Sequence, residues 1–350
     1  MSQYLEDRSE KLKVLHNIYN IEPMEMTQKF TEFKELSRIS KISQNKGVEL
    51  SKFNIFPYKY TLLDHSYGIA LILDNFKQSP IHILEAILHE IATPAFRDGY
   101  SYLKSYFKIT SKLEPEIFNY IVASDSLFEG FFKGQVSIDE IQDYKKFHLG
   151  FADFPRLSAK NLEYILYNAF FTGICELEEI KDFYYDLSIG LSEYKTEEFC
   201  FSDLTLAKKF FKLSLEIGKK YRSYESKITL RYLADILMLM VRREDLDLKE
   251  FFILNDVDII KKGKNSTDKR IKDAWNTLEN LDKVDIKFNP IEDKEKYCVK
   301  VSGRAIYIDP LIKTKDGIFR LSHIDKSVDY EIEVFTSVDT DMYMYINHEL

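Results

Sequence analysis

The chain has 350 residues, of which 45% are hydrophobic and 30% are charged, as in an ordinary globular protein. Its formal net charge of −8 argues against broad nucleic-acid binding, which requires a basic face. Only 12 glycines and 8 prolines occur, so few sharp turns are expected, and this favours long helices over a many-stranded sheet.

The first 20 residues, MSQYLEDRSEKLKVLHNIYN, carry acidic residues early and lack the apolar stretch of a signal peptide. No run of apolar residues approaches 18, so no membrane span is expected. The three cysteines are Cys175, Cys200 and Cys298, and their wide spacing indicates neither a zinc knuckle nor a disulfide framework. A reduced, cytoplasmic setting is the expectation.

Helical periodicity dominates the first 285 residues. An amphipathic helix is predicted over 26–43, and a buried helix over 65–76. Ser79 and Pro80 then provide a cap and a first-turn proline for a helix over 81–92, which Pro94 is expected to stop. Further helices are predicted over 114–132, 137–147, 158–174, 204–221 and 228–244.

The pattern changes near residue 285 to the period-two alternation of strands. Strands are predicted within 296–312, 318–324, 330–338 and 342–346. The expected architecture is therefore mainly α, with a helical domain over 1–285 and a small β-rich C-terminal subdomain over 286–350.

Three histidines lie near one another in the sequence between 65 and 89. His65 begins one apolar segment, and His89 ends another, "EAILHEIA", where Glu90 is an acidic residue in an apolar run. His82 is seven residues before His89, so the two cannot bind one ion, and His82 is interpreted as a surface residue. Because a buried carboxylate is costly without a partner, Glu90 is expected to face an ion, a cation or a polar cleft.

Four motifs in order carry a resemblance to a known family. They are "ISQNKG…FPYKYTLLDHSYGIALIL", "AILHEIATPAF", "FPRLSAKNLEYIL" and "IYIDPLI…FRLS". Together they resemble the HD superfamily of metal-dependent phosphohydrolases, especially its deoxynucleotide triphosphohydrolase-like branch, over roughly residues 35 to 325. The resemblance implies an HD-domain helical bundle, and relatives that commonly self-associate, so a homo-oligomer is expected.

In this family a histidine, a His-Asp pair and a distant aspartate bind one divalent cation, such as Mn, Mg, Fe or Ni. Matched by position, the resemblance places these ligands at His65, at His89 with Glu90, and at Lys160. Glu90 keeps the charge of the aspartate with one more methylene, whereas a protonated lysine cannot bind a metal. Asp153 is a possible substitute for the lost ligand.

Other positions of the family's site are also altered here. Its phosphate-contacting arginine falls on Leu62, two further histidines fall on Thr93 and Asp98, and an aspartate falls on Asn168. Gln44 and Tyr164 match the family pattern. We count Gln44, Tyr164, Asn168, Asp98 and Thr93 as candidate ligand-binding residues, and His65, His89, Glu90 and Lys160 as candidate catalytic residues.

These substitutions suggest that the metal has been lost. A Glu90–Lys160 ion pair would then replace it, since an unpaired buried carboxylate is strongly destabilising. If the alignment is shifted by one residue, Asn161 takes the place of Lys160.

Three functions follow from this sequence. The favoured hypothesis is a pseudoenzyme with no cofactor, which acts by binding a phosphate-bearing or nucleotide-like ligand or by protein interaction. The alternative is an active metal-dependent phosphohydrolase that uses His65, His89 and Glu90. A second alternative is metal-free lyase or transferase chemistry with Lys160 as the base, because burial can lower the pKa of a lysine.

Overall fold

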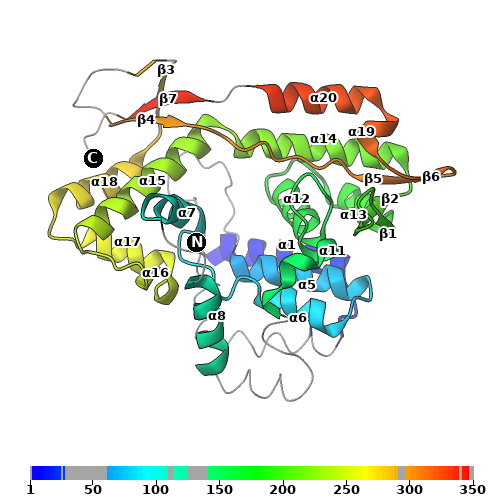
Figure 1. The fold of residues 1–350 in the computed structure, drawn as a ribbon, viewed down its shortest axis with the longest axis horizontal. Coiled ribbons are helices and arrows are strands. Elements are labelled where there is room, and N and C mark those ends of the chain that lie inside the picture. The colour runs from blue at the N-terminus through cyan, green and yellow to red at the C-terminus, as the bar shows by residue number, and fades with distance from the viewer. Residues whose placement is uncertain are drawn as a thin grey trace.

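The structure is a computed structural model that describes residues 2–24, 27, 61–108, 113–124, 141–287, 289–290, 297–338 and 341–346. Gln44 and the helix predicted over 26–43 lie outside the described residues, apart from residue 27. The fold is mainly helical with small sheets, as the sequence predicted (Figure 1). None of the described helices is long and apolar enough to cross a membrane.

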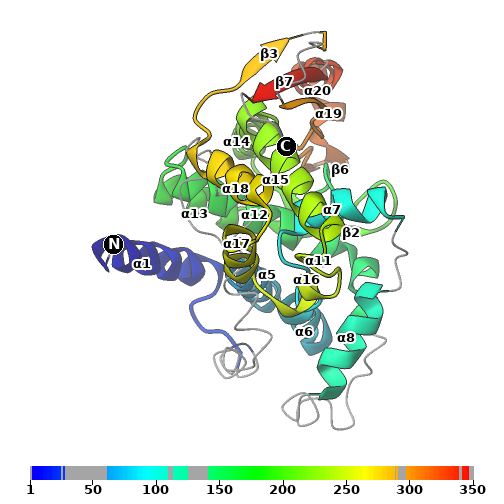
Figure 2. The same ribbon diagram turned by 90° about the vertical axis from the view of Figure 1, so that its left-hand side faces the viewer.

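The helices form two packed groups, each with its own hydrophobic core. The first group is α1 (Ser2–Tyr19), α5 (Leu62–Asn75), α6 (Pro80–Leu88), α11 (His148–Phe151), α12 (Ala159–Phe171), α13 (Leu177–Tyr185) and α14 (Leu204–Tyr221). The second is α7 (Arg97–Tyr106), α15 (Tyr224–Arg242), α16 (Glu250–Ile253), α17 (Asp256–Lys264) and α18 (Lys269–Asn280). Figure 2 views the molecule from the side of α16, α17 and α18. The remaining described helices are α8 (Leu113–Ser124), α19 (Leu321–Ile324), α20 (Lys326–Ser337) and the short 3-10 helix η1 (Tyr144–Lys146).

Two small sheets complete the fold. One has the order β1-β2-β5-β6, from β1 (Ser188–Leu191), β2 (Glu197–Phe201), β5 (Leu311–Thr314) and β6 (Gly317–Arg320). The other has the order β3-β7-β4, from β3 (Asp285–Lys287), β7 (Met342–Ile346) and β4 (Tyr297–Val301). Among the described strands, only β2 and β5 pair in parallel. The sequence did not predict β1 and β2, which join the C-terminal strands to the helical part of the chain; the domain boundary near 285 stays a prediction.

A cluster of charged side chains fastens the β1-β2-β5-β6 sheet, and we call Glu193, Glu198 and Arg320 the sheet ion cluster. Glu198 and Arg320 are buried, whereas Glu193 is 39% exposed. Arg320 lies on β6 and donates to both carboxylate oxygens of Glu198 on β2, at 2.7 and 2.5 Å, across the intervening strand β5. Its Nε donates to Glu193 at 3.1 Å, and its Nη1 also donates to the carbonyl of Asp309. The arginine of the "IYIDPLI…FRLS" motif therefore holds two strands from distant parts of the chain together.

One C-terminal prediction was wrong in type, and another was correct only over 318–320. Residues 330–338 were predicted as a strand but form most of α20, because Val328, Ile332 and Phe335 follow helical spacing and place one face on the core. Asp325 caps this helix by accepting from the Ser327 amide at 2.8 Å. Residues 318–324 change from β6 to α19 at Leu321, whereas the strands at 297–301 and 342–346 are confirmed.

Two of the helices around the candidate site, α5 and α12, begin at side-chain caps. Thr61 and Asp64 form a capping box that starts α5 and places His65 in its first turn. Ser158 caps α12, as predicted. The helix predicted over 81–92 ends earlier than expected, at Leu88, so that His89 is its C-cap and Glu90 lies in the turn that follows.

Candidate metal and phosphate site

His65, His89 and Glu90 come together in the fold, and we call them the donor cluster. Their potential ligand atoms all lie within 4.8 Å of one another. The imidazole rings of His65 and His89 are 5.7 Å apart, centre to centre, because α5 and α6 pack side by side. All three side chains are almost completely buried. The early end of α6 makes this possible, since the turn after Leu88 carries Glu90 back toward His89.

Hydrogen bonds at Nδ1 determine which imidazole nitrogen faces the cluster. His65 Nδ1 lies 2.5 Å from Glu163 Oε2, and His89 Nδ1 lies 2.8 Å from the carbonyl oxygen of Ala86. Because both partners are acceptors, each Nδ1 carries the hydrogen and each Nε2 carries a lone pair. His89 Nε2 is buried, has no hydrogen-bond partner, and lies 3.5 Å from Glu90 Oε1. The arrangement presents lone pairs to one point, as metal ligands do.

Burial keeps both histidines neutral. Desolvation lowers the pKa of His65 to about 3 and that of His89 to about 4, although the charge of Glu90 opposes the shift. For Glu90, burial opposes ionisation, but the charge of Arg97 and smaller effects of both histidines lower its pKa to about 2. At neutral pH the donor cluster therefore consists of two neutral imidazoles and one carboxylate.

The cation that pairs with Glu90 is Arg97, not Lys160 as the sequence led us to expect. Arg97 Nη1 donates to Glu90 Oε1 at 2.8 Å, and Thr93 Oγ1 donates to Glu90 Oε2. Arg97 reaches Glu90 because it begins α7 only seven residues later, after a sharp reversal of the chain. Lys160 acts on Glu90 through its charge without an ion-pair contact. Glu90 is therefore ion-paired, but with Arg97 and not with Lys160, and the replacement of a metal by such a pair stays a prediction.

Lys160 nevertheless lies near the site. It is half-buried in the first turn of α12, and its charge lowers the pKa of both His65 and His89. Burial lowers the pKa of Lys160 itself, against the opposing effect of Glu90, and this is the direction that a lysine base requires. The alternative alignment through Asn161 gains nothing, because its amide already donates to the carbonyls of Ala152 and Arg156, each at 2.8 Å.

The other candidate residues are divided between the site and the scaffold. Asp98 lies beside Arg97, with Oδ1 3.5 Å from Arg97 Nε, and its charge also acts on Tyr164. Burial raises the pKa of Tyr164, so its hydroxyl stays protonated. Asn168 donates to the carbonyl of Tyr164 at 2.7 Å and is satisfied within its own helix. Asp153 acts on Lys160 through its charge, and no donor group of the described residues includes it.

Two residues of the site were missed by the sequence argument, Glu163 and Arg97. Glu163 is completely buried on α12 and fixes the ring of His65, and an acidic residue inside the apolar run "NLEYILY" was the available signal. Gly68 makes room for it, because a Cβ at Gly68 would lie 2.8 Å from Glu163 Cγ. Arg97 had no signal in the sequence, since its reach depends on the chain reversal before α7.

The residues present fit a divalent cation held by three protein ligands. Two imidazole nitrogens and one carboxylate suit Fe, Ni, Zn or Mn better than Mg, which prefers oxygen ligands. The carboxylate of Glu163 behind His65 is the outer-shell partner that metal-bound histidines usually have. Glu90 also has Arg97 as a counter-ion, so its charge is balanced without a metal as well.

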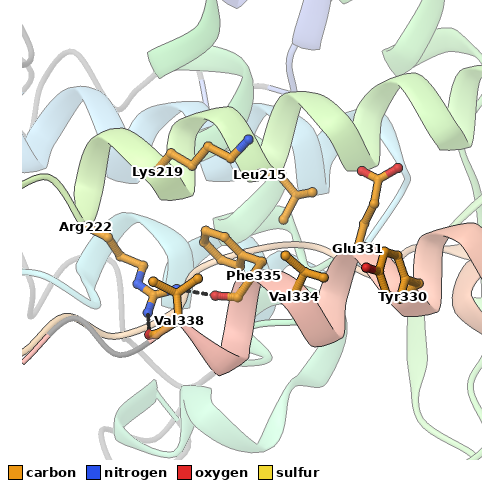
Figure 3. Close-up of a pocket in the computed structure, with 8 residues that line it drawn as sticks. All are labelled: Leu215, Lys219, Arg222, Tyr330, Glu331, Val334, Phe335 and Val338. Carbon is orange, nitrogen blue, oxygen red and sulfur yellow. Dashed lines mark hydrogen bonds between the residues drawn. The ribbon is translucent and has the colours of Figure 1, made fainter.

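A separate groove lies between α14 and α20 and has a volume of about 360 Å³ (Figure 3). Its wall is mainly apolar, and Arg222 closes one end by donating to the carbonyls of Phe335 and Val338, at 2.5 and 3.0 Å. The lining residues are Leu215, Lys219, Arg222, Tyr330, Glu331, Val334, Phe335 and Val338. No member of the donor cluster lines this groove.

Comparison with known proteins identifies the fold. No family model matches the chain, and no curated protein matches its sequence. The crystal structure of a hypothetical protein from Aquifex aeolicus is similar to this chain, with 13% sequence identity and a TM-score of 0.63 over 93% of each chain. A solved phosphohydrolase from Bacteroides thetaiotaomicron has 14% identity and a TM-score of 0.62, over 90% of this chain and 94% of that one. The chain thus shares its fold with a phosphohydrolase, in agreement with the expected HD-like fold.

Proposed function

We propose that the protein is a divalent-metal-dependent phosphohydrolase that acts on a phosphoester. The observation that carries this proposal is the donor cluster, in which the Nδ1 partners of His65 and His89 direct two lone pairs toward the carboxylate of Glu90. The fold shared with a phosphohydrolase supports it. The triphosphohydrolase branch and a nucleotide substrate remain finer predictions from the resemblance.

Each residue of the site has a role in this proposal. His65, His89 and Glu90 hold the cation, and Glu163 fixes the ring of His65. When bound, such a cation polarises a phosphoryl oxygen and lowers the pKa of a bound water. Arg97 is about half-exposed at 48% and touches Glu90, so its remaining donors can bind a phosphate oxygen. Lys160 adds a second positive charge for the same anion.

Metal analysis and turnover test the proposal together. The purified protein is loaded with Mn, Fe, Ni or Zn, freed of excess metal, and assayed on a phosphomonoester, a phosphodiester and the four deoxynucleoside triphosphates. We expect about one equivalent of metal and turnover with at least one substrate, both abolished by His89→Ala. His82→Ala is the matched control, because His82 lies on the same helix but pairs with Glu85 at 2.7 Å and stacks on Phe147.

A second candidate function is metal-free binding of a phosphate-bearing ligand, as in a pseudoenzyme. The specific observation in its favour is that Arg97 and Thr93 already occupy both oxygens of Glu90. Under this function the protein binds no stoichiometric metal and shows no turnover, yet calorimetry detects binding of a nucleotide that Arg97→Ala weakens. Metal bound through His65 and His89 would exclude it.

A further inference from the structure

The residue before Arg97 has an unusual backbone conformation. Phe96 has φ 50° and ψ 48°, in the left-handed region that bulky side chains rarely adopt. The chain reverses at Phe96, after the turn that holds Glu90, and α7 begins at the next residue. The conformation of Phe96 therefore sets the direction in which Arg97 starts α7. Such a strained conformation persists only where the surroundings enforce it.

The surroundings come from the second helical group. The Phe96 amide donates to Asp256 Oδ1 at 2.9 Å, and the neighbouring Ala95 amide donates to the carbonyl of Phe251 at 2.7 Å. Asp256 is the first residue of α17 and is only 2% exposed. The Phe96 ring is buried in the second core, with its centre 6.1 Å from that of Trp275.

These contacts connect α17 to the donor cluster, because the residue that Asp256 holds is directly followed in the chain by the residue that pairs with Glu90. Asp256 holds Phe96, and the next residue, Arg97, donates to Glu90 at 2.8 Å. We propose that Asp256 is a positioning residue, which fixes the Phe96 backbone so that Arg97 meets Glu90 and a bound phosphate. The proposal rests on the proposed function for its kinetic test.

The kinetic test is a double-mutant cycle between Asp256 and Arg97 in the metal-loaded protein. We expect Asp256→Ala to lower kcat/KM for the phosphoester about tenfold, and to cause no further loss when Arg97 is already alanine. Asp256→Asn should restore most of the activity, because its side-chain oxygen can accept from the same amide. Equal losses in both backgrounds would overturn the proposal.

A neighbouring cap provides the structural control. Asn255 is the residue before Asp256 and caps α17 by accepting from the Asp258 amide at 2.9 Å. This hydrogen bond lies within α17 and does not involve Phe96. Asn255→Ala should lower the urea midpoint of unfolding, as other cap deletions do, and leave kcat/KM unchanged. If Asp256→Ala does not fold, Asp256→Ser replaces it, since its shorter side chain cannot reach the Phe96 amide.

A second readout does not depend on catalysis. Phenylglyoxal modifies arginines more slowly when they are ion-paired, and peptide mapping reports the rate at Arg97 alone. Asp256→Ala or Asp256→Ser should raise this rate several-fold over the wild type, whereas Asn255→Ala should not. A wild-type protein without turnover refutes the proposed function, and the modification rates still decide the positioning role; equal rates in all variants would overturn it.

Discussion

The sheet ion cluster and the donor cluster both contain buried charged or titratable side chains, yet they differ in how their hydrogen bonds are satisfied. In the sheet ion cluster, Arg320 donates to Glu193, to both oxygens of Glu198 and to a backbone carbonyl, so donors and acceptors match. In the donor cluster, by contrast, lone pairs of nitrogen and oxygen atoms face one another. His89 Nε2 accepts no hydrogen bond from the described residues and lies 3.5 Å from Glu90 Oε1. A closed set of hydrogen bonds is a structural device, whereas an open set of acceptors is suited to an ion.

The largest expected effect follows from removing the arginine of the sheet ion cluster. Arg320→Met leaves Glu198 completely buried without its cation, and removal of one partner of a buried ion pair costs about 3–5 kcal/mol. Urea denaturation of the metal-free protein measures this loss. The control is Lys264→Met, which breaks an exposed pair with Glu279 and should cost less than about 1 kcal/mol. Equal losses in the two variants would show that the cluster is not structural.

The donor cluster should instead make the stability of the metal-free protein sensitive to acid. The folded pKa values of His65 and His89, about 3 and 4, lie below the ordinary value of 6.5. Between pH 6.5 and about 4 the unfolded chain therefore binds protons that the folded protein does not, so stability falls as the pH falls. The limit is about 1.4 kcal/mol per pH unit for each histidine.

Glu90 adds to this loss at lower pH. Its folded pKa of about 2 lies below the ordinary value of 4.5, so its contribution is complete above pH 4.5 and disappears as the pH falls toward 2. Urea denaturation at pH 7, 6 and 5 isolates the histidine contribution, and His89→Gln should reduce the slope. A stability that does not change between pH 7 and 5 would contradict the burial of two neutral histidines.

The same comparison shows what could be predicted from the sequence. The apolar periodicity was sufficient for α5 and α14, and together with the Ser158 cap for α12, because local signals decide those helices. The resemblance to the HD superfamily implied that His65, His89 and Glu90 belong to one site, and the structure brings them together. The partner of Glu90 could not be predicted, since it depends on the left-handed Phe96, and that conformation depends on Asp256, 160 residues away. Residues 330–338 have an alternation that fits a strand, and tertiary packing made them a helix.

A smaller effect is expected at the outer shell of the donor cluster. In Gly68→Ala the new methyl group would lie 2.8 Å from Glu163 Cγ and 2.9 Å from its Oε1, so the carboxylate must move away from His65. Loss of an outer-shell partner typically lowers metal affinity 10- to 100-fold. Competition with a fluorescent chelator measures the affinity. The matched control is Gly190→Ala on β1, whose methyl group would lie 3.0 Å from Ile318 Cδ1 and 3.1 Å from Cys200 Cβ, outside the donor cluster, and should leave the affinity unchanged.

The smallest effect is expected for Lys160→Met, at the position where the resemblance placed a distant aspartate. Lys160→Met removes a positive charge that acts on all three members of the donor cluster, so metal affinity should rise a few-fold, about 1 kcal/mol. Lys160→Asp should raise it by a further factor of about ten if α12 presents this position to the ion. Lys146→Met, which removes an exposed charge paired with Asp143, should change nothing.

The difference between these two variants separates charge from ligation. If Lys160→Asp and Lys160→Met raise the metal affinity equally, the first turn of α12 acts on the ion only through charge. The donor cluster then provides all three protein ligands of the metal. If aspartate alone gives the large gain, the scaffold still presents a fourth ligand position, and Lys160 is what keeps the ion weakly held. In that case Arg97 and Lys160 act together, since each supplies positive charge that a phosphate can use and a metal must overcome.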